Sequence, residues 1–302
     1  MPKTLIIVTG PTGVGKTKLG IILAKHFDTE IVSADSRQIF RELSIGTAVP
    51  TPGELSMVKH HFIHSHSITE NYNASKYEAE ALKRLDELFL KHNEVVMVGG
   101  SMLYIDAVCK GIDILPDADP EIRESLKTRF ETEGIESLRL QLKKLDPGYY
   151  NIVDLKNPAR VIHALEICLT AGKPYSSFRT SPKKERPFRI IKTGLNCDRE
   201  ILHQRINKRV DKMIEAGLEN EAGGVYHLKH LNALNTVGYK EFFSHFEGEI
   251  TRGEAIELIK RNSRRYARKQ ITWFGKDTET KWFEPNQGTE IIKTIENRIS
   301  KK

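Results

Sequence analysis

Two hydrophobic patterns alternate along the first hundred residues. Short runs rich in β-branched residues occur at Leu5–Val8, Glu30–Ser33 and Val95–Val98, and such runs are typical of strands in a parallel sheet that is buried on both faces. Between them, apolar residues recur with the spacing of an amphipathic helix over Lys16–Phe27 and Ser75–Leu90. This alternation predicts an α/β core with a mostly parallel sheet flanked by helices.

The pattern becomes helical and highly charged after Pro116. Helical periodicity covers Pro120–Phe130 and Ile135–Leu145. A third helix is predicted between Asn157, a good N-terminal cap, and Gly172, a good C-terminal stop. These helices predict an insertion that interrupts the core.

The apolar run Phe188–Leu195 predicts a return of the chain to the sheet, and the residues from Arg199 onward are expected to be helical almost throughout. We therefore expect a core of residues 1–116 and about 187–302, with a helical insertion at about 117–186.

Composition narrows the class of protein. The 302 residues include 47 Lys and Arg against 40 Asp and Glu, a net charge of +7, and such a surplus favours a polyanionic partner. Cys109, Cys168 and Cys197 are too few and too widely spaced for a disulfide framework. Because no apolar run reaches the length of a signal peptide or membrane span, we expect a cytoplasmic protein without a membrane partner.

The strongest chemical signal is a glycine-rich loop placed between the first predicted strand and helix. Its eight residues match the phosphate-loop pattern of nucleotide-binding and ATP-binding proteins: Gly10, Pro11, Thr12, Gly13, Val14, Gly15, Lys16 and Thr17. The glycines let backbone N–H groups face an anion, Lys16 adds a positive charge, and Thr17 offers a hydroxyl to Mg²⁺. The loop therefore predicts a diphosphate or triphosphate site.

In typical phosphate-loop hydrolases a second apolar strand ends in an Asp that supports Mg²⁺. Here the run Val95–Val98 ends in Gly99-Gly100-Ser101 instead. Asp35 instead follows the second strand, at the same edge of a parallel sheet as the phosphate loop. It could be a metal ligand or a base, or it could cap the next turn of helix, a role that Ser36 could also fill.

Two further clusters have less specific interpretations. His60, His61, His64 and His66 lack a nearby Cys or carboxylate to complete a metal site, so we favour packing or phosphate contacts. The segment Lys260–Lys269 carries six cations and no acid, and it is either a solvated face or a surface that contacts phosphates. Its expected buried stripe comprises Ala255, Leu258, Ile259, Tyr266 and Trp273.

Taken together, the motifs resemble the tRNA dimethylallyltransferases, also called tRNA isopentenylpyrophosphate transferases. The resemblance runs nearly end to end. It rests on the phosphate loop, Asp35–Arg41, Gly46–Ala48, His60-His61, Gly99–Tyr104, Asn157–Arg160, Gly172–Pro174, Gly238–Glu241 and Arg265–Phe274. Departures are small, such as Ser101 where the family more often has Thr.

This resemblance implies a phosphate-loop fold and a Mg²⁺-dependent transfer of a dimethylallyl group from dimethylallyl diphosphate. The acceptor would be the exocyclic amine of the adenosine 3′ of the anticodon, in tRNAs that read codons beginning with U. The phosphate loop and Arg123 would bind the diphosphate, Lys16 would stabilise its charge, and Thr17 would hold the metal. Asp35 would be the base and Ser101 would lie near the reacting adenine.

The resemblance also implies that the anticodon arm of tRNA contacts a small set of residues, with a monomeric enzyme as the expected state. The implied tRNA contacts are Asp35, Ser36, Arg37, Gln38, Ser101 and Arg123. Three alternatives remain at this stage: an adenylate isopentenyltransferase acting on free nucleotide, a phosphate-loop nucleoside kinase, and a nucleotide-dependent RNA-binding switch without covalent chemistry.

Overall fold

The computed structural model describes residues 2–113, 115–116, 119–180 and 184–301. The chain divides into two compact units, Met1–Cys109 with Glu185–Lys302, and Lys110–Lys184. Residue 117, where the insertion was expected to begin, lies outside the described residues.

The larger unit is built on a six-stranded sheet with the strand order β3-β2-β4-β1-β5-β6. Every neighbouring pair is parallel, which confirms the predicted α/β class. The strands are β1 (Thr4–Thr9), β2 (Ile31–Ala34), β3 (His60–His61), β4 (Glu94–Gly99), β5 (Arg189–Leu195) and β6 (Lys281–Phe283).

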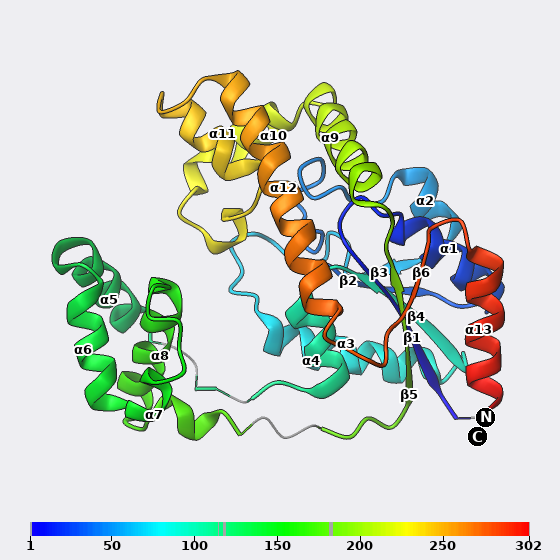
Figure 1. Cartoon of the computed structure of the whole chain (residues 1–302), viewed down its shortest axis with the longest axis horizontal. Helices are drawn as coiled ribbons and strands as arrows, with labels where there is room; N and C mark the ends of the chain where they lie inside the picture. Colours follow the sequence, from blue (N-terminus) through cyan, green and yellow to red (C-terminus); the bar gives the residue numbers. More distant parts are fainter. Residues whose placement is uncertain (1, 114, 117–118, 181–183, 302) are drawn as a thin grey trace. The chain divides into compact units, whose positions relative to one another are not determined.

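Helices cover both faces of this sheet (Figure 1). The helices of the larger unit are α1 (Lys16–His26), α2 (Pro52–Met57), α3 (Ala74–Phe89), α4 (Met102–Lys110), α9 (Arg199–Glu215), α10 (Leu218–Val225), α11 (Tyr239–Phe246), α12 (Arg252–Phe274) and α13 (Gly288–Ser300). Short 3-10 turns lie at Tyr226–Leu228 and Asn232–Leu234.

The alternation of side chains along β1 explains the layers. Ile6 and Val8 pack in one core with residues of α1 and α13, whereas Leu5 and Ile7 pack in a second core with residues of α3 and α4. Successive residues of a strand point to opposite faces of the sheet, and all six residues of β1 are buried. A strand apolar at consecutive positions therefore requires a helical layer on each side.

A third core joins α9, α10, α11 and α12 to the segment after β2. Ile39, Leu43 and Phe242 are buried within it. This core brings the C-terminal helices against the turn that carries Asp35. It thereby forms a wall around the carboxyl ends of the strands.

The smaller unit is a helical bundle around its own core of Leu126, Leu138, Leu142, Val161 and Leu165. Its helices are α5 (Pro120–Glu133), α6 (Ile135–Leu145), α7 (Pro147–Tyr150) and α8 (Pro158–Ala171), followed by a 3-10 turn at Tyr175–Phe178. The predicted cap is present, because the Asn157 side chain accepts a hydrogen bond from the Arg160 N–H.

His60 and His61 form the short edge strand β3, which was not predicted from the sequence. Two sequence expectations were wrong. One is the C-terminal region that was expected to be helical almost throughout, because β6 interrupts it; the other is the buried stripe of α12. The buried stripe of α12 is made by Ala255, Ile259, Ala267, Gln270 and Phe274, whereas Tyr266 and Trp273 are 37% and 40% exposed. The polar Gln270 can be buried in this stripe because both ends of its side-chain amide have hydrogen-bond partners.

Candidate active site

The phosphate loop connects β1 to α1 in a conformation that depends on glycine. Gly10, Gly13 and Gly15 all have positive φ angles, of 139°, 81° and 110°. At Gly10 a Cβ atom would also lie 2.3 Å from the backbone oxygen of Leu195, which excludes any side chain. The loop therefore packs directly on the end of β5 and delivers Lys16 to the first turn of α1.

Lys16 is held against its own loop. Its Nζ donates hydrogen bonds to the backbone oxygens of Gly10 and Pro11, at 3.0 and 2.9 Å. Burial and the neighbouring Arg209 together lower the pKa of Lys16 to about 7, against the opposing effect of the Asp35 carboxylate. An anion entering the loop would restore the favourable environment for the charged form of Lys16.

Asp35 follows β2 at the same edge of the sheet and organises the turn after it. Its Oδ1 accepts hydrogen bonds from the N–H groups of Arg37 and Gln38, at 2.9 and 3.2 Å. Among the described residues, none donates a hydrogen bond to its Oδ2. One oxygen of Asp35 therefore caps the turn, as one sequence interpretation expected, and the other is available for chemistry.

Ser101 lies beside this turn, at the end of β4. Its Oγ accepts a hydrogen bond from the Ser36 N–H at 2.7 Å and donates one to the Ser36 Oγ at 3.1 Å. Its backbone N–H donates to the Ala34 oxygen at 3.2 Å. The structure thus joins the loops after β2 and β4, as their positions at one sheet edge predict.

Gln38 stabilises a neighbouring loop. Its Nε2 donates to the backbone oxygens of Thr47 and Ala48, at 3.1 and 2.9 Å. From the other side, the carboxylate of Glu221 on α10 accepts from the N–H groups of Ser44, Ile45 and Gly46. These contacts fix the loop that forms part of the cavity wall.

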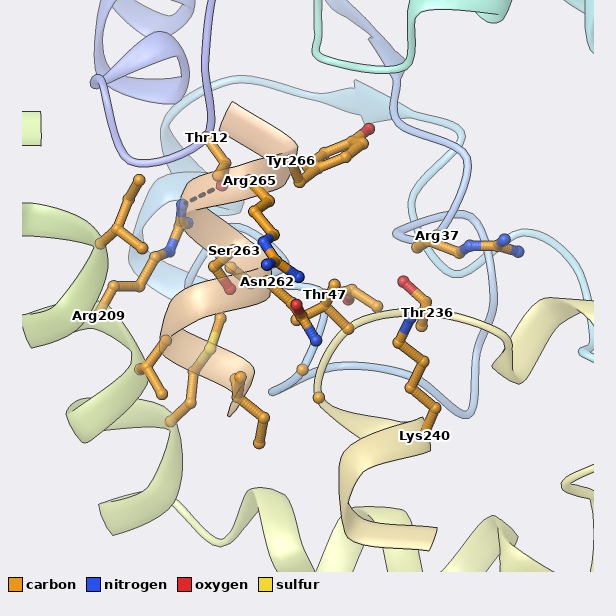
Figure 2. A pocket seen from close by; sticks show the side chains of 18 of the residues that line it. Thr12, Arg37, Thr47, Arg209, Thr236, Lys240, Asn262, Ser263, Arg265 and Tyr266 are labelled. Carbon is orange, nitrogen blue, oxygen red and sulfur yellow. Dashed lines mark hydrogen bonds between the residues drawn. The ribbon is translucent and has the colours of Figure 1, made fainter. Parts of the chain in front are cut away.

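A cavity of about 680 Å³ lies against these loops, within the larger unit (Figure 2). Its lining is strongly cationic, with Asp35 as the one acidic side chain among the described lining residues. The cationic lining residues are Arg37, Arg209, Lys240, Arg265, Arg268 and Lys269. A cavity of this size with such a lining suits an anionic ligand.

Arg209 and Tyr266 are site residues that were not singled out as such from the sequence. Arg209 reaches the phosphate loop from α9, where its Nη1 lies 3.4 Å from the Thr12 Oγ1 (Figure 2). Arg205, one helical turn earlier, approaches the Val14 oxygen at 3.5 Å. The i,i+4 spacing of these two arginines is the signal that could have identified this basic face of α9.

Tyr266 lies on α12 and contributes its ring to the cavity (Figure 2). Its hydroxyl is 3.4 Å from the Gly100 oxygen. Burial, together with the negative charge of Asp35, raises the pKa of Tyr266 to about 12. Tyr266 therefore stays neutral and acts as a hydrogen-bond donor near Asp35.

Arg37 also lines the cavity, and its guanidinium is directed away from the other labelled side chains (Figure 2). Burial lowers the pKa of Arg37 and outweighs the opposing effects of Tyr104, Asp35 and Tyr266, so the net shift is downward. The turn that carries Asp35 thus contributes a cation as well as a carboxylate.

Arg123 belongs to the smaller unit and is not free there. Its Nε lies 2.7 Å from Oε1 of Glu166, and its Nη2 donates to Oε2 at 3.0 Å. Burial raises the pKa of Glu166, but hydrogen bonds from His163 and Arg123 lower it by more, so the net shift is downward. Arg123 therefore presents a fixed guanidinium whose charge is partly balanced.

Thr17 and the metal hypothesis can be tested on the donor groups present. In the described part of the chain, no group of three or more His, Cys, Asp or Glu could hold a metal ion. The Thr17 hydroxyl has no hydrogen-bond partner among these residues, and it stands at the first turn of α1 beside Lys16. This donor set fits a Mg²⁺ ion that takes most of its ligands from a diphosphate and water.

Comparison with known proteins identifies this arrangement. The family model described as IPP transferase matches residues 38–277. The chain belongs to the IPP transferase family. It is 57% identical to tRNA dimethylallyltransferase 1 of Bacteroides thetaiotaomicron, over 97% of this chain and 95% of that protein. It is 56% identical to tRNA dimethylallyltransferase 1 of Phocaeicola vulgatus, over 98% of each.

Solved structures of the family agree with the fold. The tRNA isopentenylpyrophosphate transferase of Bacillus halodurans is 33% identical, with a TM-score of 0.72 over 98% of this chain and 97% of that one. A eukaryotic dimethylallyltransferase captured acting on tRNA is 25% identical, with a TM-score of 0.74 over 90% of this chain and 69% of that one. No helix in the described residues is long and apolar enough to span a membrane.

Proposed function

We propose that this IPP transferase moves the dimethylallyl group of dimethylallyl diphosphate onto the exocyclic amine of the adenosine 3′ of the anticodon. The substrates are tRNAs that read codons beginning with U, and the products are the N6-alkylated adenosine and diphosphate. The observation that carries the proposal is the pairing of a phosphate loop with the free oxygen of Asp35 at one sheet edge. Strand β4 ends in Gly99 rather than in the carboxylate of a nucleotide hydrolase.

In this proposal the phosphate loop binds a leaving group. Lys16 and the loop amides stabilise the charge that develops on the departing diphosphate, and Arg209 adds a second cation at Thr12. Thr17 would hold Mg²⁺, which when bound neutralises part of the diphosphate charge. The depressed pKa of Lys16 favours this role, because a diphosphate would restore the positive charge.

Asp35 acts as the general base for the acceptor. The C–O bond of the donor breaks, the new C–N bond forms to the adenine amine, and the amine proton passes to Asp35. An adenine amine is a very weak acid, so its proton leaves only as the C–N bond forms, and an ordinary carboxylate suffices. Ser101 is proposed to hydrogen-bond near the reacting base, which must leave its stack to enter the cavity.

The tRNA contacts are part of the same proposal. Asp35–Gln38 and Ser101 face the reacting nucleotide, while Arg123 and the smaller helical unit bind the anticodon arm. The fixed guanidinium of Arg123 and the cationic cavity lining support a polyanionic acceptor. We also propose that the enzyme works as a monomer in the cytoplasm, where tRNA is found; light scattering at assay concentration tests the monomer.

The deciding experiment uses the full chain with dimethylallyl diphosphate, Mg²⁺ and unmodified tRNA, followed by nucleoside mass spectrometry. We expect a five-carbon mass gain on one adenosine and an equal amount of diphosphate. Parallel incubations contain AMP as acceptor, or ATP with nucleosides. Alkylated AMP without alkylated tRNA, or ADP in place of diphosphate, would replace the proposal with one of its alternatives.

The metal assignment has its own test. Thr17→Ala should raise the Mg²⁺ concentration that gives half-maximal turnover, because it removes the proposed ligand. Thr17→Ser retains the hydroxyl and should behave like the parent enzyme. Equal Mg²⁺ dependence in all three proteins would remove Thr17 from the metal site.

A further inference from the structure

Gln270 is a buried polar side chain that the proposed chemistry does not use. It lies on α12, is 1% exposed, and does not line the cavity. Both ends of its amide are engaged. Its Oε1 accepts a hydrogen bond from the Thr12 N–H at 2.8 Å, and its Nε2 donates one to the Gly100 oxygen at 2.9 Å.

The two partners of Gln270 belong to different loops. Thr12 is in the phosphate loop after β1, and Gly100 is in the turn after β4 that leads to Ser101. Backbone groups at strand ends lack ladder partners, and leaving them buried without a hydrogen bond is unfavourable. A primary amide can accept from one loop and donate to the other at the same time, so its length sets the spacing between them.

The atoms around the Gln270 bridge are closely packed. A Cβ atom on Gly100 would lie 2.3 Å from the Gln270 Nε2 and 3.5 Å from the Lys16 Nζ. The bridge, the Gly100 turn and Lys16 are therefore packed together. A shift of the phosphate loop relative to this turn would move Lys16 as well.

The bridge also affects which amides can face a ligand. Because the Thr12 N–H donates to Gln270, it is not available to a diphosphate, and the anion is left with the later amides of the loop. The Thr12 hydroxyl remains near Arg209. Gln270 thus restricts the orientation of the loop without touching the substrate.

We propose that Gln270 is a positioning residue that fixes the distance between the diphosphate loop and the Ser101 turn. This inference rests on the proposed function, since the first loop is taken to hold the donor and the second to lie beside the acceptor base. The expected consequence is that loss of the bridge weakens diphosphate binding and slows transfer, while tRNA binding is retained.

The first test replaces Gln270 with Met, which fills similar space without hydrogen bonds. Diphosphate affinity is measured by calorimetry without RNA, tRNA affinity by filter binding, and kcat and KM by diphosphate release. We expect about tenfold weaker diphosphate binding, a lower kcat and unchanged tRNA affinity. Gln204→Met, on an exposed position of α9, is the matched control, and thermal melting verifies that each variant is folded.

The second test uses Gln270→Glu, because a neutral carboxyl group can donate to Gly100 and accept from Thr12, whereas a carboxylate cannot donate. The Lys16 amine on α1, Asp35 after β2, Arg209 on α9 and Tyr266 on α12 are the ionisable groups around the two loops. The new carboxylate also raises the pKa of the nearby Lys16. The readout is therefore the ratio of variant to parent activity, with the proton uptake on diphosphate binding measured in both proteins to follow the charge of Lys16. This ratio should fall as the pH rises from about 5.5 to about 8.

Two results would overturn the inference. One is a folded Gln270→Met variant with parental diphosphate affinity and kcat. The other is a Gln270→Glu variant as active as the parent over the whole pH range. Failure of the proposed function is distinguishable from both, because the parent enzyme would then fail to alkylate tRNA whatever residue 270 is.

Discussion

Asp35 combines a structural and a chemical role in a single carboxylate, and two substitutions separate them. Asn retains an Oδ1 acceptor for the N–H groups of Arg37 and Gln38 but cannot take a proton, whereas Ala loses both roles. We expect Asp35→Asn to lower kcat by about 100-fold to 10,000-fold, the usual contribution of a general base, with little loss of stability. Single-turnover alkylation of tRNA and thermal melting are the measurements.

The control for this prediction is Asp35→Ala, which should lose activity to a similar extent and also melt at a lower temperature. Near-normal turnover of the Asn variant, with unchanged tRNA affinity, would show that Asp35 is not the base. Ser101 would then be the next group to test, because its Oγ is hydrogen-bonded to the same turn.

Lys16 predicts a pH dependence of diphosphate binding. Its pKa in the free protein is about 7, so at about pH 8 most molecules carry a neutral amine. A bound diphosphate raises that pKa, so binding takes up a proton and the affinity falls as the pH rises above 7. Calorimetry in two buffers with different ionisation enthalpies counts the protons taken up.

Lys16→Arg separates this effect from the titration of diphosphate itself, because arginine stays charged throughout the range. We expect the Arg variant to take up fewer protons at about pH 8 than the parent. Equal uptake by both proteins would mean that Lys16 is already charged before the ligand binds.

At the scale of elements, the cavity wall depends on a contact between α10 and the loop after β2. The Glu221 carboxylate accepts from three successive N–H groups, of Ser44, Ile45 and Gly46, and from the Tyr239 hydroxyl at 2.6 Å. In Glu221→Gln an NH₂ group replaces one acceptor and faces these donors. We expect a loss of about 1–3 kcal/mol in the free energy of unfolding, measured by urea denaturation.

Glu215→Gln makes the same chemical change at an exposed position of α9 and should leave stability unchanged. Because Gly46, Thr47 and Ala48 line the cavity, the Glu221 variant should also have a lower kcat/KM. Equal stability of the two Gln variants would mean that Glu221 does not hold the loop.

The helices and strands that could be predicted from the sequence are those long enough to show a regular pattern of apolar residues. The strands β1, β2, β4 and β5 and the helices α1, α3, α5, α6 and α8 are all close to their predicted ranges, because each buries a continuous run or one stripe. Strands β3 and β6, of two and three residues, carry too few positions to show a period. They are strands only because they pair with β2 and β5.

The same limit applies to the stripe of α12 and to the site. The aromatic Tyr266 is partly exposed at the cavity, whereas the polar Gln270 is buried. Each position is determined by contacts with residues far away in the sequence. Gly10–Thr17, Asp35 and Ser101 could be placed at one sheet edge from the sequence, because each follows a predicted strand of a parallel sheet. Arg209 and the double bridge of Gln270 could not, since they depend on how α9 and α12 pack against the loops.

At the scale of the whole molecule, the net charge of +7 is unevenly placed. Six cations line the cavity together with a single described acid, and Arg265 forms no ion pair with the described residues. Binding of tRNA should therefore weaken steeply with salt, because each phosphate contact releases counterions. The measurement is the tRNA dissociation constant at several salt concentrations.

Arg265→Ala makes this prediction specific. If Arg265 contacts a phosphate, its removal should weaken tRNA binding and reduce the slope of log Kd against log salt by about one unit. Lys293→Ala removes one exposed charge on α13, outside the cavity lining, and should leave the slope unchanged. Equal slopes in both variants and the parent would mean that Arg265 is a solvated cation that contacts no phosphate of the RNA.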